Sequence, residues 1–312
     1  MGVSEMKVSK WIHGSIAGAA LIFVLAGVGV GLAGGQGPSD LPIKYEELTA
    51  SDFVKAVALS ERTCVIPVGI LEKHGPHLPL GTDLLDCREL SFRAAKKEYT
   101  IVFPEYYCGQ IFEAKHQPGT IAYSPRLMLD MLQETCDELG RNGITKIILV
   151  NGHGGNEQFL QYFCQIQLSS RKDYAVFLFD PSDDRTMPEK LDKLRKTALD
   201  GHAGEEETSS VLAHRPDLVH PERAKDESGE DRKRLAHLKH VYTGIWWYAS
   251  QPNHYRGDGS AGNKEFGELA FSLESDLLAE MIRGIKKDTT TLELQRLFFE
   301  QSSKPLETGR SK

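Results

Sequence analysis

The sequence has little that would indicate a disulfide scaffold or a nucleic-acid surface. Its five cysteines are odd in number and form no Cys-x-x-Cys pair, and all but Cys108 lie in apolar-patterned segments, which favours buried thiols. Lys and Arg number 37 against 44 Asp and Glu, a net charge of -7, whereas nucleic-acid-binding surfaces need clustered positive charge. The absent Gly-x-Ser-x-Gly motif disfavours a Ser-His-Asp hydrolase. We expect no nucleic-acid partner, and a small neutral or cationic molecule as the ligand.

The N-terminal segment differs from the rest of the chain because it contains a long stretch without charged residues. Residues 14–39 carry no charged side chain and follow Lys7 and Lys10. Their apolar part is close to the ~20 residues of a membrane-spanning helix, and small residues at its end could form a cleavage site. We predict export, with residues 1–36 as a signal peptide or an N-terminal anchor, and a periplasmic or membrane-anchored protein facing outside the cytoplasm. Membrane contact is expected only through residues 14–35, and only if this segment is not cleaved from the protein.

From about residue 50 onward, β-branched runs alternate with amphipathic helical patterns in a chain of ordinary globular composition, 40% hydrophobic and 26% charged. Apolar runs predict strands at 64–70, 101–103, 146–150 and 175–179. Helices are predicted at 84–97, from Ser124 as N-cap to Gly140, after Asn156, up to Ala213, and over 266–285. For the helix that begins at Ser124, the predicted apolar face consists of Leu127, Met128, Met131, Leu132 and Leu139. The alternation predicts a layered αβα domain, an α/β fold with a mostly parallel central sheet.

We assign this domain to residues 37–300, followed by a disordered tail at 301–312. A charged insertion occupies residues 221–240, where eleven of twenty residues are charged and no apolar stripe is present. A solvated helix is favoured there over a segment at a subunit contact or over a ligand site. Two adjacent tryptophans, Trp246 and Trp247, fall in a predicted strand. They could approach a ligand pocket from this part of the chain, but one core and one surface residue is the favoured interpretation.

The stretch from Glu72 to Asp83 carries most of the functional signal. It places Glu72, His74, His77 and Asp83 among glycine and proline residues directly after a predicted strand. Carboxylate and imidazole together suit Zn²⁺, Mn²⁺ or Fe²⁺, whereas Ca²⁺ prefers oxygen ligands alone. The sequence therefore predicts a transition-metal site at the mouth of the sheet, with His77 as a hydrogen-bonding support for a ligand.

Two further polar clusters are placed to join this stretch, because ligands gather beyond the carboxyl ends of parallel strands. His153 follows the strand at 146–150 in a turn that glycine alone would serve, so metal ligation is the favoured role. Before a later helix, His202 is a candidate acid/base residue and Glu207 a candidate ligand. Glu205 and Glu206 are interpreted as helix N-terminal charges, and weaker candidates for contact with a ligand are Glu113, Lys115, His116, His254 and Asp258.

Together these motifs resemble the creatinine amidohydrolase (creatininase) family over about residues 45–285. The matching residues are Glu72-Lys73-His74-Gly75-Pro76-His77-Leu78-Pro79 with Asp83, then Asn151-Gly152-His153-Gly154-Gly155-Asn156, then His202-Ala203-Gly204 with Glu207-Thr208, and a Pro118-Gly119-Thr120-Ile121 segment. The resemblance implies a dinuclear metal hydrolase that opens amide bonds, often in rings, and assembles into homo-oligomers, commonly hexamers.

The resemblance also implies residue roles. Glu72 and His74 match the first ligand pair and address different metals, Asp83 matches the bridging carboxylate, and His153 matches the imidazole ligand. His202 matches the histidine near the substrate, and Glu207 the acidic residue of the third motif. The expected cofactors are two divalent metal ions, Zn²⁺ first, with Mn²⁺ or Fe²⁺ as alternatives.

Two departures from the family pattern bear on the substrate. Creatininase has Tyr and then a ligating Glu where this chain has Gly154 and Gly155, so Glu207 is the natural replacement ligand, and a single-metal enzyme remains an alternative. Ala198 stands where creatininase has a tryptophan beside the substrate histidine. Creatinine itself is therefore not the expected substrate.

The resulting hypothesis is an exported metal-dependent hydrolase of a small molecule, cleaving a cyclic amide or related C-N bond with a metal-bridging hydroxide. His202 would protonate the leaving nitrogen or stabilise the tetrahedral intermediate. Two alternatives remain: a hydrolase of a keto-sugar or lactone ring on the same fold, and a non-catalytic metal- or ligand-binding protein.

Overall fold

The computed structural model describes residues 41–180 and 186–307. The predicted signal peptide or anchor at residues 1–36 lies outside the described residues, as does the end of the predicted tail, residues 308–312. Within the described ranges, no helix is both long and apolar enough to cross a membrane. All five cysteines are described, and each is a free thiol.

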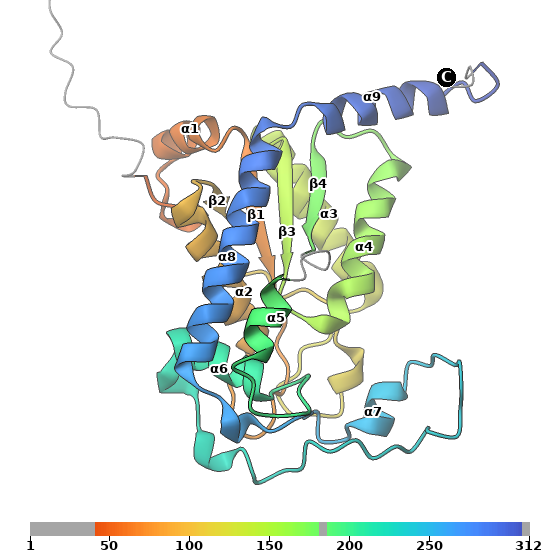
Figure 1. The fold of residues 1–312 in the computed structure, drawn as a ribbon. Helices are drawn as coiled ribbons and strands as arrows, with labels where there is room; N and C mark the ends of the chain where they lie inside the picture. Colours follow the sequence, from red (N-terminus) through yellow and green to blue (C-terminus); the bar gives the residue numbers. More distant parts are fainter. Residues whose placement is uncertain (1–40, 181–185, 308–312) are drawn as a thin grey trace, which may run out of the picture. The chain divides into compact units, whose positions relative to one another are not determined.

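Four parallel strands form one sheet in the order β2-β1-β3-β4 (Figure 1). Their bounds are Thr63–Val68 for β1, Ile101–Val102 for β2, Lys146–Asn151 for β3 and Ala175–Phe179 for β4. Strand β1 is buried along its whole length and β3 along all but its last residue, as expected for parallel strands covered on both faces. The predicted parallel sheet is thereby confirmed.

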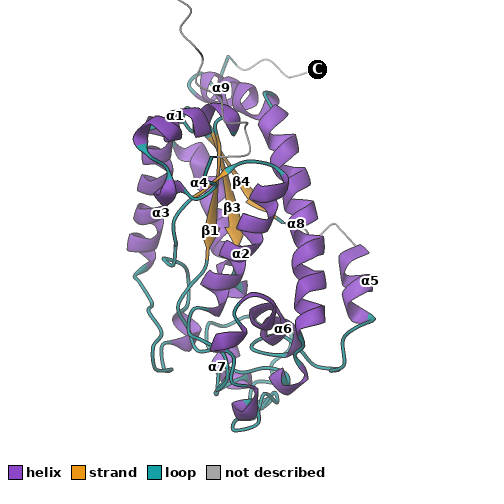
Figure 2. Cartoon of the chain, turned by 90° about the vertical axis from the view of Figure 1, so that its left-hand side faces the viewer, coloured by secondary structure: helices purple, strands orange, loops and turns teal. Residues whose placement is uncertain are grey.

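Helices cover both faces of the sheet, which gives the predicted αβα layering; Figure 2 shows the sheet between α3 on one side and α8 on the other. On one face, Ile66 of β1 packs in a cluster with residues of α3 (Pro125–Arg141) and α4 (Glu157–Ile166). On the other, Val65 packs in a cluster with residues of α2 (Thr82–Lys97) and α8 (Lys264–Lys287). The alternation follows from the two-residue period of a strand.

Helix α3 begins as predicted, because Pro125 is its first residue and the Ser124 hydroxyl accepts a hydrogen bond from the Leu127 backbone N–H at 3.4 Å. The apolar face predicted for α3 included two residues that the structure leaves exposed. Leu127 and Met131 are 44% and 42% exposed, and the buried positions are Met128, Leu132, Cys136 and Leu139. Each of the two exposed residues precedes a buried one and so lies about 100° away around the helix.

The remaining α-helices of the described residues are α1 (Ala50–Leu59), α5 (Thr186–Asp192), α6 (Glu205–His214), α7 (Trp246–Ser250) and α9 (Thr290–Ser302). Helix α9 ends two residues beyond the predicted domain end at 300. Residues 221–240 are mostly exposed but contain only a single 3-10 turn, Pro221–Arg223, so the solvated helix predicted there was wrong. The strand predicted at Trp246 and Trp247 was also wrong, because both belong to α7.

Candidate metal centre

The loops that follow β1 and β3 meet the start of α6 at the carboxyl ends of the strands (Figure 1). Glu72 and His74 follow β1, Asp83 is the second residue of α2, and His153 follows β3. Glu207 lies in the first turn of α6. The structure brings these five predicted ligands into one cluster, in which Glu72 and His74 are fully buried.

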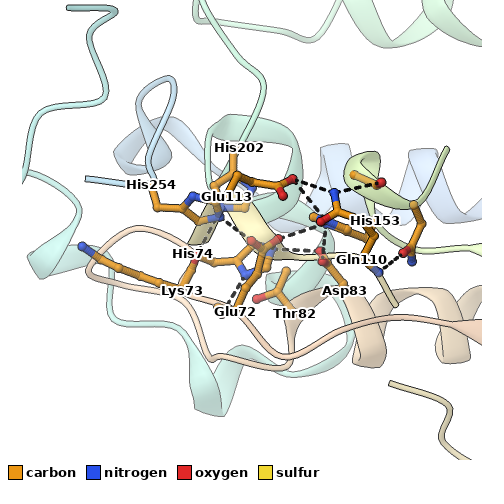
Figure 3. A network of polar contacts seen from close by, with 12 residues as sticks. Glu72, Lys73, His74, Thr82, Asp83, Gln110, Glu113, His153, His202 and His254 are labelled. Carbon is orange, nitrogen blue, oxygen red and sulfur yellow. Dashed lines mark hydrogen bonds and ion pairs between the residues drawn. The ribbon is translucent and has the colours of Figure 1, made fainter. Parts of the chain in front are cut away.

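Asp83 is shared between two groups of potential ligands (Figure 3). Its Oδ2 lies 3.0 Å from His153 Nδ1, which is also 3.0 Å from Glu72 Oε1. Its Oδ1 lies 2.8 Å from His74 Nε2, which is 3.8 Å from Glu207 Oε2. In each group of three residues the ligand atoms lie within 4.8 Å of one another. This arrangement is what two ions joined by one carboxylate require.

Two buried oxygens in this cluster fit such ions. Glu72 Oε1 and Asp83 Oδ2 have no hydrogen bond to any of the described residues, although both lie close to His153 Nδ1. A buried carboxylate oxygen without a hydrogen bond is costly and rare in native proteins. Divalent cations bind carboxylate oxygen and imidazole nitrogen, so the residues present fit a transition-metal centre.

The pKa shifts of the cluster also fit a bound cation. Burial lowers the pKa of His74, but Asp83, Glu207 and Glu72 outweigh burial and raise that pKa to about 10. Burial raises the pKa of Glu207 to about 8, although the neighbouring His74 opposes the change. Without a cation, protons therefore balance the negative charge of the three carboxylates.

His202 lies above the same centre, at the start of the third motif. Its Nε2 is 3.0 Å from the Lys73 carbonyl oxygen, and since a carbonyl only accepts, Nε2 donates and Nδ1 keeps its lone pair. Nδ1 lies 3.8 Å from Glu207 Oε2. Burial lowers the pKa of His202 to about 3, so the ring is neutral near pH 7. His202 also lies close enough to Glu72 and His74 to form a third possible ligand group.

His77 and Glu205 stabilise the surroundings of the centre. His77 Nε2 lies 2.8 Å from the Thr208 hydroxyl, so His77 contacts α6 beside Glu207, and no hydrogen bond joins it to a predicted ligand side chain among the described residues. The buried Glu205 carboxylate accepts hydrogen bonds from the backbone N–H groups of Lys196 and Thr197 at 2.8 to 3.0 Å. Glu205 therefore fixes the preceding loop rather than serving only as a helix N-terminal charge.

The structure places at the centre two residues to which the sequence pattern assigned only a minor part, His254 and Trp247. His254, only 2% exposed, contacts Glu72 Oε2 through its Nε2, and the Trp247 indole N–H donates to His254 Nδ1 at 2.7 Å. His254 was a weak candidate and Trp247 was placed in a strand. Asp258 instead accepts a hydrogen bond from the Ser260 backbone at 3.0 Å and belongs to none of the ligand groups.

Among the other weak candidates, only Glu113 approaches the centre, with Oε1 4.0 Å from His153 Nε2. Lys115 is exposed, and His116 Nε2 lies 2.9 Å from the carbonyl oxygen of Pro252. Gln110, which the sequence did not single out, has its Nε2 3.4 Å from Glu113 Oε1.

Gly155 is the position in the second motif where a side chain has no room. A Cβ there would lie 2.5 Å from His153 Nε2 and 2.7 Å from Glu113 Oε1, whereas a Cβ on Gly154 would meet nothing within 4 Å. The space next to His153 that a side chain at Gly155 would need is therefore filled by other residues of this chain.

A cavity of about 390 Å³ adjoins the centre at Glu207. It lies between α2, α6 and α8 and has a strongly acidic lining that includes Asp86, Asp200, Glu206, Glu207 and Glu274, and Arg195 is the one basic residue among the described residues that line it. Arg195 is paired with Glu206 at 3.1 Å. The volume is in the range of small-molecule sites.

Comparisons with known proteins identify the family of this chain. The family model described as Creatininase, creatinine amidohydrolase, matches residues 46–282. The chain is 29% identical over 194 residues to creatinine amidohydrolase of Pseudomonas putida, covering 58% of this chain and 75% of that protein. It is also 29% identical over 161 residues to a mycofactocin precursor peptide peptidase of Mycolicibacterium smegmatis, covering 50% and 59%.

A third relative is 3-dehydro-scyllo-inosose hydrolase of Thermotoga maritima, 29% identical over 171 residues, with 52% of this chain and 53% of that protein covered. The chain therefore spans less than two thirds of the length of the peptidase and of this hydrolase. Among solved structures, a crystal structure of creatininase matches with a TM-score of 0.68 and 24% identity, over 79% of this chain and 99% of that one. At that identity the structural match shows the fold alone. The family model, which matches most of the chain, shows the family: this chain belongs to the creatininase family of hydrolases.

Proposed function

We propose that the protein is a metal-dependent hydrolase that cleaves an amide C-N bond, in a cyclic amide or a related small molecule. The observation that carries the proposal is the position of Asp83, whose two carboxylate oxygens face two groups of ligands, all of them buried except the partly exposed Glu207. Glu72 and His153 complete one group, and His74 and Glu207 the other. Zn²⁺ is the first choice of ion, with Mn²⁺ or Fe²⁺ as alternatives; the related solved creatininases include a manganese form and a Zn-Zn form.

The chain's own residues have defined parts in this reaction. Bound divalent ions would supply a water that is nucleophilic near neutral pH and would polarise the scissile carbonyl. His202 is held by the hydrogen bond from its Nε2 to the Lys73 carbonyl, so only Nδ1 is free to take part. We assign to Nδ1 the acceptance of a proton from the attacking water and its delivery to the leaving nitrogen.

The surroundings support a substrate other than creatinine. Ala198 is exposed and offers no aromatic wall. A tryptophan does contact His202: Trp247 approaches its ring edge-on from α7, with ring centroids 5.8 Å apart. The acidic lining of the adjoining cavity favours a neutral or cationic molecule over an anion.

Export and oligomerisation belong to the proposal as well. Export rests on the uncharged, apolar residues 14–35 alone. A homo-oligomer, with a hexamer as the first expectation, rests on the family resemblance.

The proposal is tested by a substrate screen on the purified full chain. We expect cyclic amides or short peptides to be hydrolysed, the activity to disappear on treatment with a chelator, and Zn²⁺ or Mn²⁺ to restore it. Turnover of keto-sugars or lactones with no turnover of any amide would replace the amide assignment by the alternative that the Thermotoga maritima relative suggests. A metal-loaded protein inactive on all four classes would favour a binding protein.

The role of His202 gives a separate prediction. Replacing His202 with glutamine removes the Nδ1 lone pair, and we expect kcat to fall about 100-fold to 10,000-fold, the usual range for a lost acid/base group. Metal content should stay at the wild-type value. A His202→Gln protein that loses one ion together with its activity would show that His202 is a ligand, as the third ligand group allows.

A further inference from the structure

Trp247 and His254 reach the centre from a part of the chain outside the three motifs. Trp247 is in α7, and His254 lies in the loop that follows it. The Trp247 Nε1–H donates to His254 Nδ1 at 2.7 Å, and His254 Nε2 contacts Glu72 Oε2. Figure 3 shows His254 and His153 on opposite sides of Glu72. These contacts join an aromatic side chain of α7 to a predicted metal ligand through one imidazole.

The identity of the donor fixes the arrangement of hydrogens. An indole N–H can only donate, so His254 Nδ1 must accept and the ring hydrogen must be on Nε2. His254 Nε2 therefore donates to Glu72 Oε2. The other oxygen, Oε1, is left without a hydrogen bond and lies 3.0 Å from His153 Nδ1, in the group that contains Asp83.

The backbone of His254 supplies a second, independent observation. Its φ is +53°, in the left-handed region that residues other than glycine seldom adopt. The backbone N–H donates to the Gln251 carbonyl at 3.0 Å, and glycine would make the same hydrogen bond without strain. An unfavourable backbone conformation kept at a buried residue indicates that its side chain is needed there.

We propose that Trp247 and His254 are positioning residues that hold Glu72 so that it offers a single oxygen, Oε1, to the metal centre. Trp247 selects the tautomer of His254, and His254 then engages Oε2 and turns Oε1 toward Asp83 and His153. Hydrogen bonds of this kind to a ligating carboxylate typically change metal affinity 10-fold to 100-fold. The inference rests on the metal centre of the proposed function.

The first test replaces Trp247 with phenylalanine, which keeps an aromatic ring and removes the donor. We expect metal affinity, measured on the full chain by competition with a chromogenic chelator, to fall about 10-fold. Trp246→Phe is the matched control, because Trp246 is the adjacent residue, is 42% exposed, and makes no indole hydrogen bond to the described residues. Its metal affinity should equal that of the wild type.

The second test replaces His254 with glycine, which removes the imidazole and relieves the backbone. We expect metal affinity to fall 10-fold to 100-fold, and the unfolding temperature of the metal-free protein to fall as well, because the Trp247 indole N–H and Glu72 Oε2 lose their partner. Free imidazole added to this variant should recover part of the lost affinity. If His254 had a merely structural role, the unfolding temperature would fall but the metal affinity would stay at the wild-type value, and free imidazole would change nothing.

The outcomes separate this inference from the proposed function. A wild-type chain that binds no divalent metal overturns both. A wild-type chain that binds metal, with Trp247→Phe and His254→Gly binding it equally tightly, overturns the inference alone. Weaker binding in His254→Gly but not in Trp247→Phe would overturn the part assigned to Trp247.

Discussion

Replacing Asp83 with alanine is expected to remove both metal ions and to lower hydrolysis about a thousandfold or more. Asp83 is the only residue common to the group with Glu72 and His153 and the group with His74 and Glu207. Without its carboxylate, each group keeps two ligands and loses the oxygen that joins them. Elemental analysis of the purified variant and a rate measurement on the substrate found in the screen check this prediction.

Two companion variants make the Asp83 prediction specific. His153 belongs to one of these two groups, so His153→Ala should lose one ion and retain the other. Glu89→Ala removes a carboxylate of the same helix that pairs with Arg93, away from the centre, and should bind metal as the wild type does. Two ions retained in Asp83→Ala would refute the bridging role.

Replacing Gly155 with alanine is the second change with a large expected effect. The new Cβ would lie 2.5 Å from His153 Nε2 and 2.7 Å from Glu113 Oε1. The Glu113 carboxylate is at the end of a flexible side chain and can move, but the His153 ring has Glu72 and Asp83 on its other side. We expect the metal ligand His153 to be displaced and the hydrolytic rate to fall about 100-fold, a loss that a misplacement of about 1 Å in an active site can cause.

The neighbouring glycine is the matched control for this prediction. A Cβ on Gly154 would meet nothing within 4 Å, so Gly154→Ala should keep the wild-type rate and metal content. Equal activity of Gly155→Ala and Gly154→Ala would show that His153 does not need the space beside Gly155. Equal loss in both variants would place the effect in the loop backbone instead of at His153.

The fold was predictable because buried parallel strands leave a strong signal. Strands β1 and β3 are covered on both faces and appear in the sequence as continuous apolar runs, and the Ser124-Pro125 pair indicated where α3 begins. Finer features were not predictable. The core face of α3 excludes Leu127 and Met131, because burial depends on the exact orientation of the helix against the sheet.

The candidate site was predictable to the extent that its residues lie next to strand ends. Glu72 and His153 follow neighbouring strands, so their convergence follows from the topology of the sheet. The contact of His254 with Glu72 could not be predicted in this way. The two residues are 182 positions apart, and the segment before His254, residues 221–250, contains no strand whose end could place it. The signal that His254 carries, a left-handed backbone at a residue other than glycine, exists only in the structure.

The most direct test of the two-ion centre is the metal content of the full chain, measured by elemental analysis after reconstitution with Zn²⁺ or Mn²⁺ and removal of free metal. The position of Asp83 between two ligand groups predicts two divalent ions per chain. One ion per chain at saturation would contradict the bridging role of Asp83, and no bound ion would contradict the metal centre itself.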